Sequence, residues 1–313
     1  MNKTNLISIP HLERIRKLYP DLPLGKVTLN NDGLVNQVVV VNNERIFRFP
    51  RSSWAREALR HEARILDLLG GKVEVTLPYY DYLADDVATY ELVRGRTLAR
   101  NLLLRLDEAG QEGIAEQLAL FLRTMHEVPA AELQAAEIGK SDTVRTREDW
   151  VKLYERVNEQ LFPYLMTHAK EWVYDHFSWV VDNPYFMEHD PVLMHGDISC
   201  YHILFDEGRR RIGGVIDFGT AGIGDPAADF ACVIYQYGES FLKRMSHTYP
   251  AIADHIDRAR FWAGTLELQW ALGGLRDMQA VVPEDDRNKA DWSWFTAHIG
   301  MNAKDVRPIG SAF

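Results

Sequence analysis

Residues 193–205 read Leu193-Met-His-Gly-Asp-Ile-Ser-Cys-Tyr-His-Ile-Leu-Phe205, and residues 214–219 read Gly214-Val-Ile-Asp-Phe-Gly219. Asp197 and His202 stand five positions apart in the first segment, and Asp217 opens a D-F-G triplet in the second. The apolar residues next to His202 and before Asp217 predict two short strands. Two carboxylates and an imidazole are therefore expected around one pair of strands.

The strands predicted at residues 203–205 and 215–216 are separated by the turn residues Asp206-Glu-Gly208. Such a turn between apolar runs predicts a hairpin. A hairpin would bring His202, at the start of one strand, beside Asp217, at the end of the other. The two side chains could then hold a single metal ion.

The spacing of Asp197 and His202 equals that of Asp and Asn in the kinase catalytic loop H-R-D-x-x-x-x-N, and D-F-G holds metal in the same class. Phosphoryl transfer needs a carboxylate to orient the attacking hydroxyl and accept its proton. It also needs a divalent metal that offsets the phosphate charge. A histidine in place of Asn departs from the protein-kinase pattern, since Mg²⁺ prefers oxygen ligands. An alternative is a metal-hydrolase cluster made by His195, Asp197, His202 and Asp217, which predicts no nucleotide site upstream.

The first ninety residues predict such a nucleotide site. Strand-like runs at residues 27–29, 37–41 and 45–49 flank the turn residues 32–36, where Gly33 and Asn36 could cover phosphates.

Two arginines near the end of the third run are candidates for the phosphate cation. Alternation along the strand places Arg48 on the face opposite Phe47 and Phe49, and Arg51 is the second candidate. A helix predicted at residues 54–69 carries Glu62, which can pair with the strand cation as a kinase helix glutamate does.

The chain divides near residue 93, into a nucleotide-binding lobe at residues 1–93 and a helical lobe at residues 94–313 that carries the catalytic loop. A strand at residues 87–93 runs into a glycine linker, as expected of a hinge, and a nucleobase edge would pair with the backbone of Glu91, Leu92 and Val93. Apolar periodicity predicts helices beyond it, at residues 113–126, 150–165, 170–181 and 256–278. His126 is expected to be a core histidine.

Composition narrows the class of protein. The 313 residues carry a formal charge of −10, which argues against nucleic acid as a partner and favours a cationic substrate. Two cysteines provide no disulfide framework. No run of eighteen apolar residues and no signal-peptide pattern occur, so a cytoplasmic protein that does not bind membranes is expected.

These motifs together resemble the aminoglycoside phosphotransferase family, nearest its aminoglycoside 2''-phosphotransferase and macrolide phosphotransferase branch. The resemblance spans about residues 25–275 and rests on Phe47-Arg-Phe-Pro50, Glu62, Gly95-Arg-Thr-Leu98, His195-Gly-Asp197, His202-Ile-Leu204, Ile216-Asp-Phe-Gly219 and Gly224-Asp-Pro-Ala-Ala-Asp229.

The resemblance implies an α+β, protein-kinase-like fold with two lobes: an antiparallel sheet with one long helix, then a mainly helical lobe. It assigns Asp197 as catalytic base and substrate contact, and His202 and Asp217 as ligands of Mg²⁺. His195 and Asp229 support the catalytic loop from behind, and Asp225 lies beside the substrate. ATP or GTP is the expected donor, a small-molecule alcohol the acceptor, and the expected protein is a monomer.

The acceptor is expected first to be an aminoglycoside, although residues 230–240 contain only one acid, Glu239, where relatives carry a dense acidic patch. Further charge could come from the last helix and tail, at Glu267, Asp277, Glu284, Asp285 and Asp286. Aromatic residues could instead line an apolar pocket for a macrolide: Tyr235, Tyr237, Trp262, Trp270, Trp292 and Trp294. A choline, homoserine or sugar kinase, and a kinase-like binding protein without turnover, are the remaining alternatives.

Overall fold

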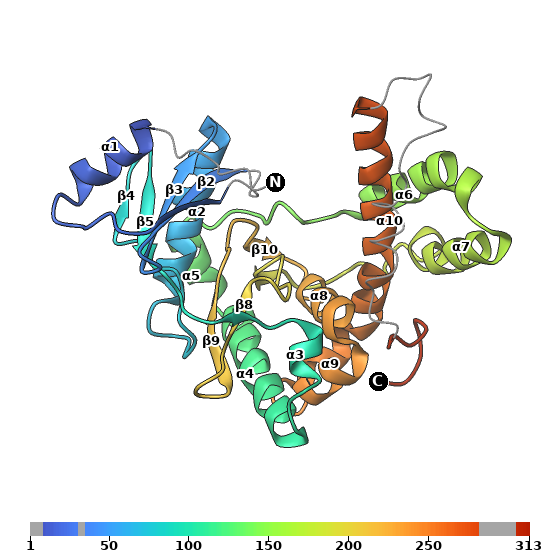
Figure 1. Cartoon of the computed structure of the whole chain (residues 1–313). Coiled ribbons are helices and arrows are strands. Elements are labelled where there is room, and N and C mark those ends of the chain that lie inside the picture. Colours follow the sequence, from blue (N-terminus) through green and yellow to red (C-terminus); the bar gives the residue numbers. More distant parts are fainter. Residues whose placement is uncertain (1–8, 31–34, 282–304) are drawn as a thin grey trace.

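The computed structural model describes residues 9–30, 35–281 and 305–313, with the side chains of 9 and 276–281 excepted. A five-stranded antiparallel sheet forms one end of the molecule, and the helices α6, α7 and α10 lie at the other (Figure 1). The order in the sheet is β1-β2-β3-β5-β4. Its strands are β1 (Val27–Asn30), β2 (Asn36–Val41), β3 (Arg45–Pro50), β4 (Tyr82–Leu83) and β5 (Ala88–Glu91). The predicted antiparallel sheet is therefore present, while Gly33 lies outside the described residues.

Strand β3 shows why the sheet has two different faces. Phe47 and Phe49 are buried against Val39 of β2 and Ile15 of α1 (Ile9–Leu18), in a small core of their own. Helix α1 was not among the predicted elements. Since side chains alternate along a strand, Arg48 points to the opposite face, where α2 lies.

Helix α2 (Ser53–Leu69) begins where the Ser52 hydroxyl accepts a hydrogen bond from the backbone N–H of Ala55, a favourable N-cap. Its buried residues Ile65, Leu66 and Leu69 join the main core of the helical part of the chain. This helix therefore connects the sheet to the rest of the molecule.

The second part is mainly helical, as predicted, around one large apolar core. The predicted helix at 150–165 is wrong at its end: α6 stops at Arg156, and the chain continues as a π turn and then a 3₁₀ turn. Pro163, in the 3₁₀ turn, cannot donate a backbone hydrogen bond, so an α-helix could not run through it to residue 165 undisturbed. The helices are α3 (Arg100–Leu103), α4 (Glu108–His126), α5 (Ala130–Ala135), α6 (Arg147–Arg156), α7 (Thr167–Val181), α8 (Ala227–Tyr237), α9 (Glu239–Met245) and α10 (Ile256–Val281). The short turns are η1 (Val157–Leu161), η2 (Phe162–Tyr164) and η3 (Pro250–His255).

Two small sheets position the catalytic segments. Strands β7 (Val192–Met194) and β10 (Gly222–Gly224) pair antiparallel. Strands β8 (Ile203–Asp206) and β9 (Arg211–Val215) form the predicted hairpin, with β6 (Arg96–Thr97) along its other edge. After β5 the chain leaves the five-stranded sheet through residues 92–95 and enters the three-stranded sheet at β6.

At Gly214 of β9 the hairpin packs tightly against Val93, which follows β5. A Cβ atom at position 214 would lie only 2.3 Å from Val93 Cγ1. Among the described residues, no helix combines the length and the apolar character that crossing a membrane requires.

Candidate active site

The catalytic loop is held by a buried carboxylate. Asp229, on the first turn of α8, accepts hydrogen bonds from the backbone N–H of His195 at 2.9 Å and of Gly196 at 2.8 Å, and its Oδ2 lies 3.1 Å from Nε2 of His126. Burial alone would raise the pKa of Asp229, but the hydrogen bond from His126 and the nearby imidazoles lower it. The ionised carboxylate therefore orients the loop, and His126 is the core histidine that the sequence predicted.

His195 is fully buried, and both of its ring nitrogens have partners. Nε2 donates to the carbonyl oxygen of Ile216 at 3.2 Å, and Nδ1 accepts from the backbone N–H of Asp197 at 3.3 Å. Burial lowers its pKa against the opposing field of Asp229, so the ring is neutral. With no nitrogen left for a metal, His195 does not fit the four-ligand hydrolase alternative.

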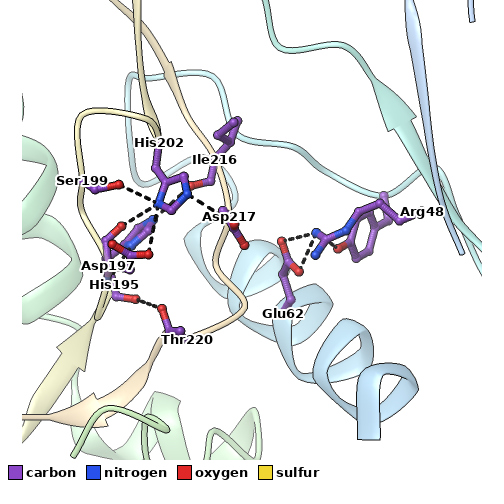
Figure 2. A network of polar contacts seen from close by, with 10 residues as sticks. Arg48, Glu62, His195, Asp197, Ser199, His202, Ile216, Asp217 and Thr220 are labelled. Carbon is purple, nitrogen blue, oxygen red and sulfur yellow. Dashed lines mark hydrogen bonds and ion pairs between the residues drawn. The ribbon is translucent and has the colours of Figure 1, made fainter. Parts of the chain in front are cut away.

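His202 and Asp217 face one another across the hairpin (Figure 2). Nδ1 of His202 lies 2.8 Å from the carbonyl oxygen of Asp197, which fixes this nitrogen as the donor. Nε2 then presents its lone pair toward Asp217, whose Oδ2 lies 3.3 Å away. Nε2 of His202 and Oδ2 of Asp217 are both acceptors and face each other, so they are suited to binding one cation between them.

Asp217 has an unusual backbone conformation, with φ at 66°. Aspartate is among the few non-glycine residues that tolerate this left-handed region, and such residues concentrate at functional sites. In this conformation the carboxylate lies beside His202, and about half of the Asp217 side chain is exposed.

Magnesium fits this pair of side chains. Two ligands of Mg²⁺ on adjacent octahedral positions lie about 3 Å apart, close to the observed separation. Among the described residues, no three His, Cys, Asp or Glu side chains gather as a metal cluster. Mg²⁺ characteristically binds through one or two protein ligands and completes its shell with phosphates and water, so two ligands suffice.

Asp197, on the catalytic loop, is the exposed acid of the group. Its side chain is about half exposed, and its Oδ2 lies 3.6 Å from Nδ1 of His202. Asp197 and Asp217 thus lie on either side of the His202 ring, both half exposed, and the Asp197 carboxylate can accept a proton from an incoming hydroxyl.

The predicted pairing of Arg48 with Glu62 is confirmed. Nη1 of Arg48 lies 2.9 and 2.8 Å from the two carboxylate oxygens of Glu62, and 2.9 Å from the hydroxyl of Tyr80. Burial disfavours the charge on Arg48, but Glu62 raises the pKa of the guanidinium well above its usual value. The pair lies on the side of Asp217 away from His202 (Figure 2). Arg51 follows β3 with an exposed side chain outside this pair.

The backbone at the hinge has one group already engaged. The N–H of Leu92 donates to the carbonyl of Glu44 at 2.7 Å, which extends the β3–β5 ladder. Because backbone groups alternate along a strand, those of Glu91 and Val93 point away from β3. Asn36, at the start of β2, is buried, and its Oδ1 has no hydrogen-bond partner among the described residues.

Two of the predicted substrate residues lie in structural ion pairs. Both carboxylate oxygens of Asp225 accept hydrogen bonds from Arg258, at 2.9 and 3.1 Å, at the end of β10 away from the catalytic loop. Glu239 is buried and accepts from Arg260 at 3.0 and 2.7 Å. These contacts satisfy both carboxylates and argue against their predicted contact with a substrate.

Helix α10 carries the other two predicted substrate residues. Trp270 is half exposed, and Glu267 is partly buried near Tyr235, whose pKa is raised by burial and by this carboxylate. Tyr237 and Trp262 belong instead to the core. The predictions for the side chains of Asp277, Glu284, Asp285, Asp286, Trp292 and Trp294 fall outside the described residues.

Two hydroxyl residues that support this site have no recognisable motif in the sequence. Thr220 donates through Oγ1 to the carbonyl of His195 at 3.2 Å, and Ser141 donates to the carbonyl of Thr220 at 2.6 Å. Ser141 lies 79 residues before its partner, so no local pattern indicates its role.

Comparisons with known proteins agree with this geometry. Residues 26–262 match the phosphotransferase enzyme family. The viomycin phosphotransferase of Streptomyces vinaceus is 25% identical over 279 residues, which cover 85% of this chain and 93% of the relative.

Solved structures with the same fold include the GDP and kanamycin complex of an APH(2'') enzyme, with a TM-score of 0.77 at 25% identity, covering 93% of this chain and 96% of that one. A type I macrolide 2'-phosphotransferase has a TM-score of 0.67 at 20% identity, covering 96% and 99%. The chain shares the kinase-like fold of these enzymes, and it belongs to the phosphotransferase enzyme family.

Proposed function

We propose that this phosphotransferase moves the γ-phosphoryl group of ATP or GTP to a hydroxyl group of an antibiotic, with an aminoglycoside as the first candidate acceptor. The observation that carries the proposal is the position of His202 between the half-exposed carboxylates of Asp197, 3.6 Å from Nδ1, and Asp217, 3.3 Å from Nε2, with the Arg48–Glu62 pair on the far side of Asp217 (Figure 2).

Each side chain has a part in the proposed reaction. Asp197 orients the acceptor hydroxyl and takes its proton as the new oxygen–phosphorus bond forms. Arg48 contributes a fixed positive charge for the phosphates, and Glu62 keeps it in place. His202 and Asp217 would hold Mg²⁺, which, when bound, neutralises the charge of the phosphate oxygens. Asp229 and His195 keep the catalytic loop in the shape that presents Asp197.

The nucleobase site is proposed at the hinge. The backbone groups of Glu91 and Val93 point away from β3 and could pair with an adenine or guanine edge, whereas the N–H of Leu92 is used within the sheet. Because only backbone groups would contact the nucleobase, the proposal includes both ATP and GTP as phosphoryl donors. Gly33 and Asn36 would cover the phosphates from the connection between β1 and β2.

The choice of an antibiotic acceptor rests on the relatives. The named activity of the S. vinaceus relative is on viomycin, and one solved relative was crystallised with GDP and kanamycin. The formal charge of −10 on this chain is also suited to a cationic acceptor. We further propose that Glu267 and Trp270 of α10 contact the acceptor, and that the protein acts as a monomer in the cytoplasm.

A second candidate, a macrolide or another acceptor with few positive charges, is favoured by one cavity. It measures about 530 Å³ and lies between α6 and α10, and its lining does not include Asp197, His202 or Asp217. Three cations line it, Arg145, Lys152 and Arg156, against one acid, Asp149, and Trp150, Leu153 and Leu272 add apolar surface. A polycationic acceptor would be repelled there, whereas an apolar one with few charges would not.

A screen of nucleotide turnover tests the proposal. The purified protein is mixed with ATP or GTP and with kanamycin-type aminoglycosides, viomycin, macrolides or simple alcohols, and phosphorylated acceptor is identified by mass spectrometry. Asp197→Ala serves as the control without catalytic base. A phosphorylated antibiotic formed only by the unaltered protein is the expected result. Nucleotide hydrolysis alone, or product from simple alcohols alone, would overturn the antibiotic assignment.

A further inference from the structure

The turn that follows Asp217 is held by hydrogen bonds from several elements. Inside the turn, the N–H of Ala221 donates to the carbonyl of Phe218 at 3.0 Å. Thr220 donates to the carbonyl of His195, and Ser141 donates to the carbonyl of Thr220. Such restraint is needed because Asp217 has a left-handed backbone, which persists only where its surroundings determine it.

A further bond to this turn comes from the first lobe. Nε2 of His61, on α2, lies 3.1 Å from the carbonyl oxygen of Ala221. Nδ1 of the same ring faces Nη2 of Arg64 at 3.4 Å. Arginine can only donate, so Nδ1 is the acceptor and Nε2 carries the hydrogen that Ala221 receives.

His61 is the neighbour of Glu62 in the sequence. Two consecutive residues of one helix point to different partners, since they are about 100° apart around the axis. Glu62 reaches Arg48, and His61 reaches the turn after Asp217. A displacement of α2 is therefore expected to move both Arg48, the proposed phosphate-binding cation, and the turn that carries Asp217, the proposed metal ligand.

We propose that His61 is a positioning residue that places Asp217. Its hydrogen bond to Ala221 couples the grip of α2 on the nucleotide phosphates to the geometry in which His202 and Asp217 share a cation. His61 touches neither substrate nor metal and acts through the turn. The inference rests on the proposed metal-binding role of Asp217.

Two amide substitutions separate the hydrogen bond from the bulk of the ring. In His61→Gln the terminal amide nitrogen reaches the position of Nε2, so the bond to Ala221 can be restored. In His61→Asn the shorter side chain reaches only the position of Nδ1, so the bond is lost. His61 is partly exposed, and neither amide is required to fill a core position.

The primary measurement is binding rather than turnover. Mn²⁺ is titrated by electron paramagnetic resonance into the full-length protein with a non-hydrolysable GTP analogue. The loss of one hydrogen bond predicts a weakening of Mn²⁺ binding by about five- to tenfold in His61→Asn. His61→Gln is expected within twofold of the unaltered protein. Analogue binding without metal is expected to be unchanged in both.

A control variant distinguishes failure of the positioning role of His61 from failure of the proposed metal site. Asp217→Asn, titrated in the same way, must weaken Mn²⁺ binding; if it does not, the metal site itself is wrong. If Asp217→Asn weakens binding and His61→Asn does not, the positioning role alone is overturned. Equal weakening in His61→Gln and His61→Asn, or failure of His61→Asn to fold in a thermal melt, would also overturn it, since the ring would then matter for packing.

Discussion

Nε2 of His202 lies 3.3 Å from Oδ2 of Asp217, while Nδ1 of the same ring lies 2.8 Å from the carbonyl oxygen of Asp197. One main-chain hydrogen bond therefore determines which nitrogen is free to bind a metal. The carbonyl that accepts it belongs to Asp197, the proposed catalytic base, so the orientation of the proposed metal ligand His202 and the path of the catalytic loop depend on each other.

Replacement of the proposed base tests the chemistry most directly. Asp197→Ala is expected to lower kcat by about two to four orders of magnitude, the usual contribution of general-base catalysis. Nucleotide affinity, measured by calorimetry, is expected to change little, because the proposed role of Asp197 is contact with the acceptor and not with the nucleotide. Near-normal turnover in this variant would refute the assignment.

The proposed role of Asp217 as a metal ligand predicts a different kinetic result. Asp217→Asn removes a negative charge from the cation site, so the Mg²⁺ concentration at half-maximal rate should rise at least about tenfold. Nucleotide binding in the presence of Mg²⁺ should weaken as well. A rate with an unaltered dependence on Mg²⁺ would count against a ligand at this position.

The buried ion pair beside the site predicts a loss of stability. Glu62 is 1% exposed and Arg48 is 12% exposed, so Glu62→Ala leaves a buried charge without its partner. Removing one partner of such a pair costs about 3–5 kcal/mol of unfolding free energy, measured by urea denaturation. The double variant Arg48→Met with Glu62→Leu should recover much of this stability, but its affinity for nucleotide should be lower than that of the unaltered protein. Recovery of normal nucleotide affinity would show that Arg48 does not contact the phosphates.

Glu239 distinguishes a structural role from substrate binding. Its partner Arg260 is almost completely buried, so Glu239→Gln should destabilise the fold by about 3 kcal/mol and leave the KM of the acceptor unchanged. Asp257→Asn, at the exposed edge of the same arginine, is the matched control and should cost less. A stable Glu239→Gln variant with a raised acceptor KM would restore the predicted substrate role.

His176 predicts how stability responds to pH. Burial lowers its pKa from 6.5 to about 4, against a hydrogen bond from Nε2 to the carbonyl of Phe261 at 2.9 Å. Between these two pH values the unfolded chain binds a proton that the folded chain does not. Stability is therefore full above pH 6.5 and falls by about 3 kcal/mol as the pH drops to 4. His176→Phe keeps a ring against Phe261 but cannot titrate, so its unfolding free energy should vary less over this interval. An unchanged slope would contradict the prediction.

Short-range patterns predicted the catalytic hairpin well. The alternation of apolar residues, the turn at residues 206–208 and the D-F-G triplet all lie within about twenty-five residues, so local geometry brings His202 to Asp217. The same holds for Arg48 and Glu62, which are 14 residues apart on a strand and the helix after it. The end of α6 was mispredicted because apolar periodicity continues through a π turn.

The acidic residues proposed to bind substrate show where sequence reasoning ends. Asp225 and Glu239 have the right charge and the right neighbourhood in the chain, but Arg258 and Arg260 on α10 neutralise them. Whether a carboxylate is available to a ligand depends on which cations approach it in space, and these arise from separate elements.

The order of residues along the chain thus specified the phosphoryl-transfer motif, because its ligands come from strands joined by a tight turn. The packing of distant segments specified the rest. His126 and Asp229, 103 residues apart, set the shape of the catalytic loop, and His61 reaches Ala221 across 160 residues. Hydrogen bonds and ion pairs act over a few ångströms of space whatever their separation in sequence, so only the folded chain could reveal them.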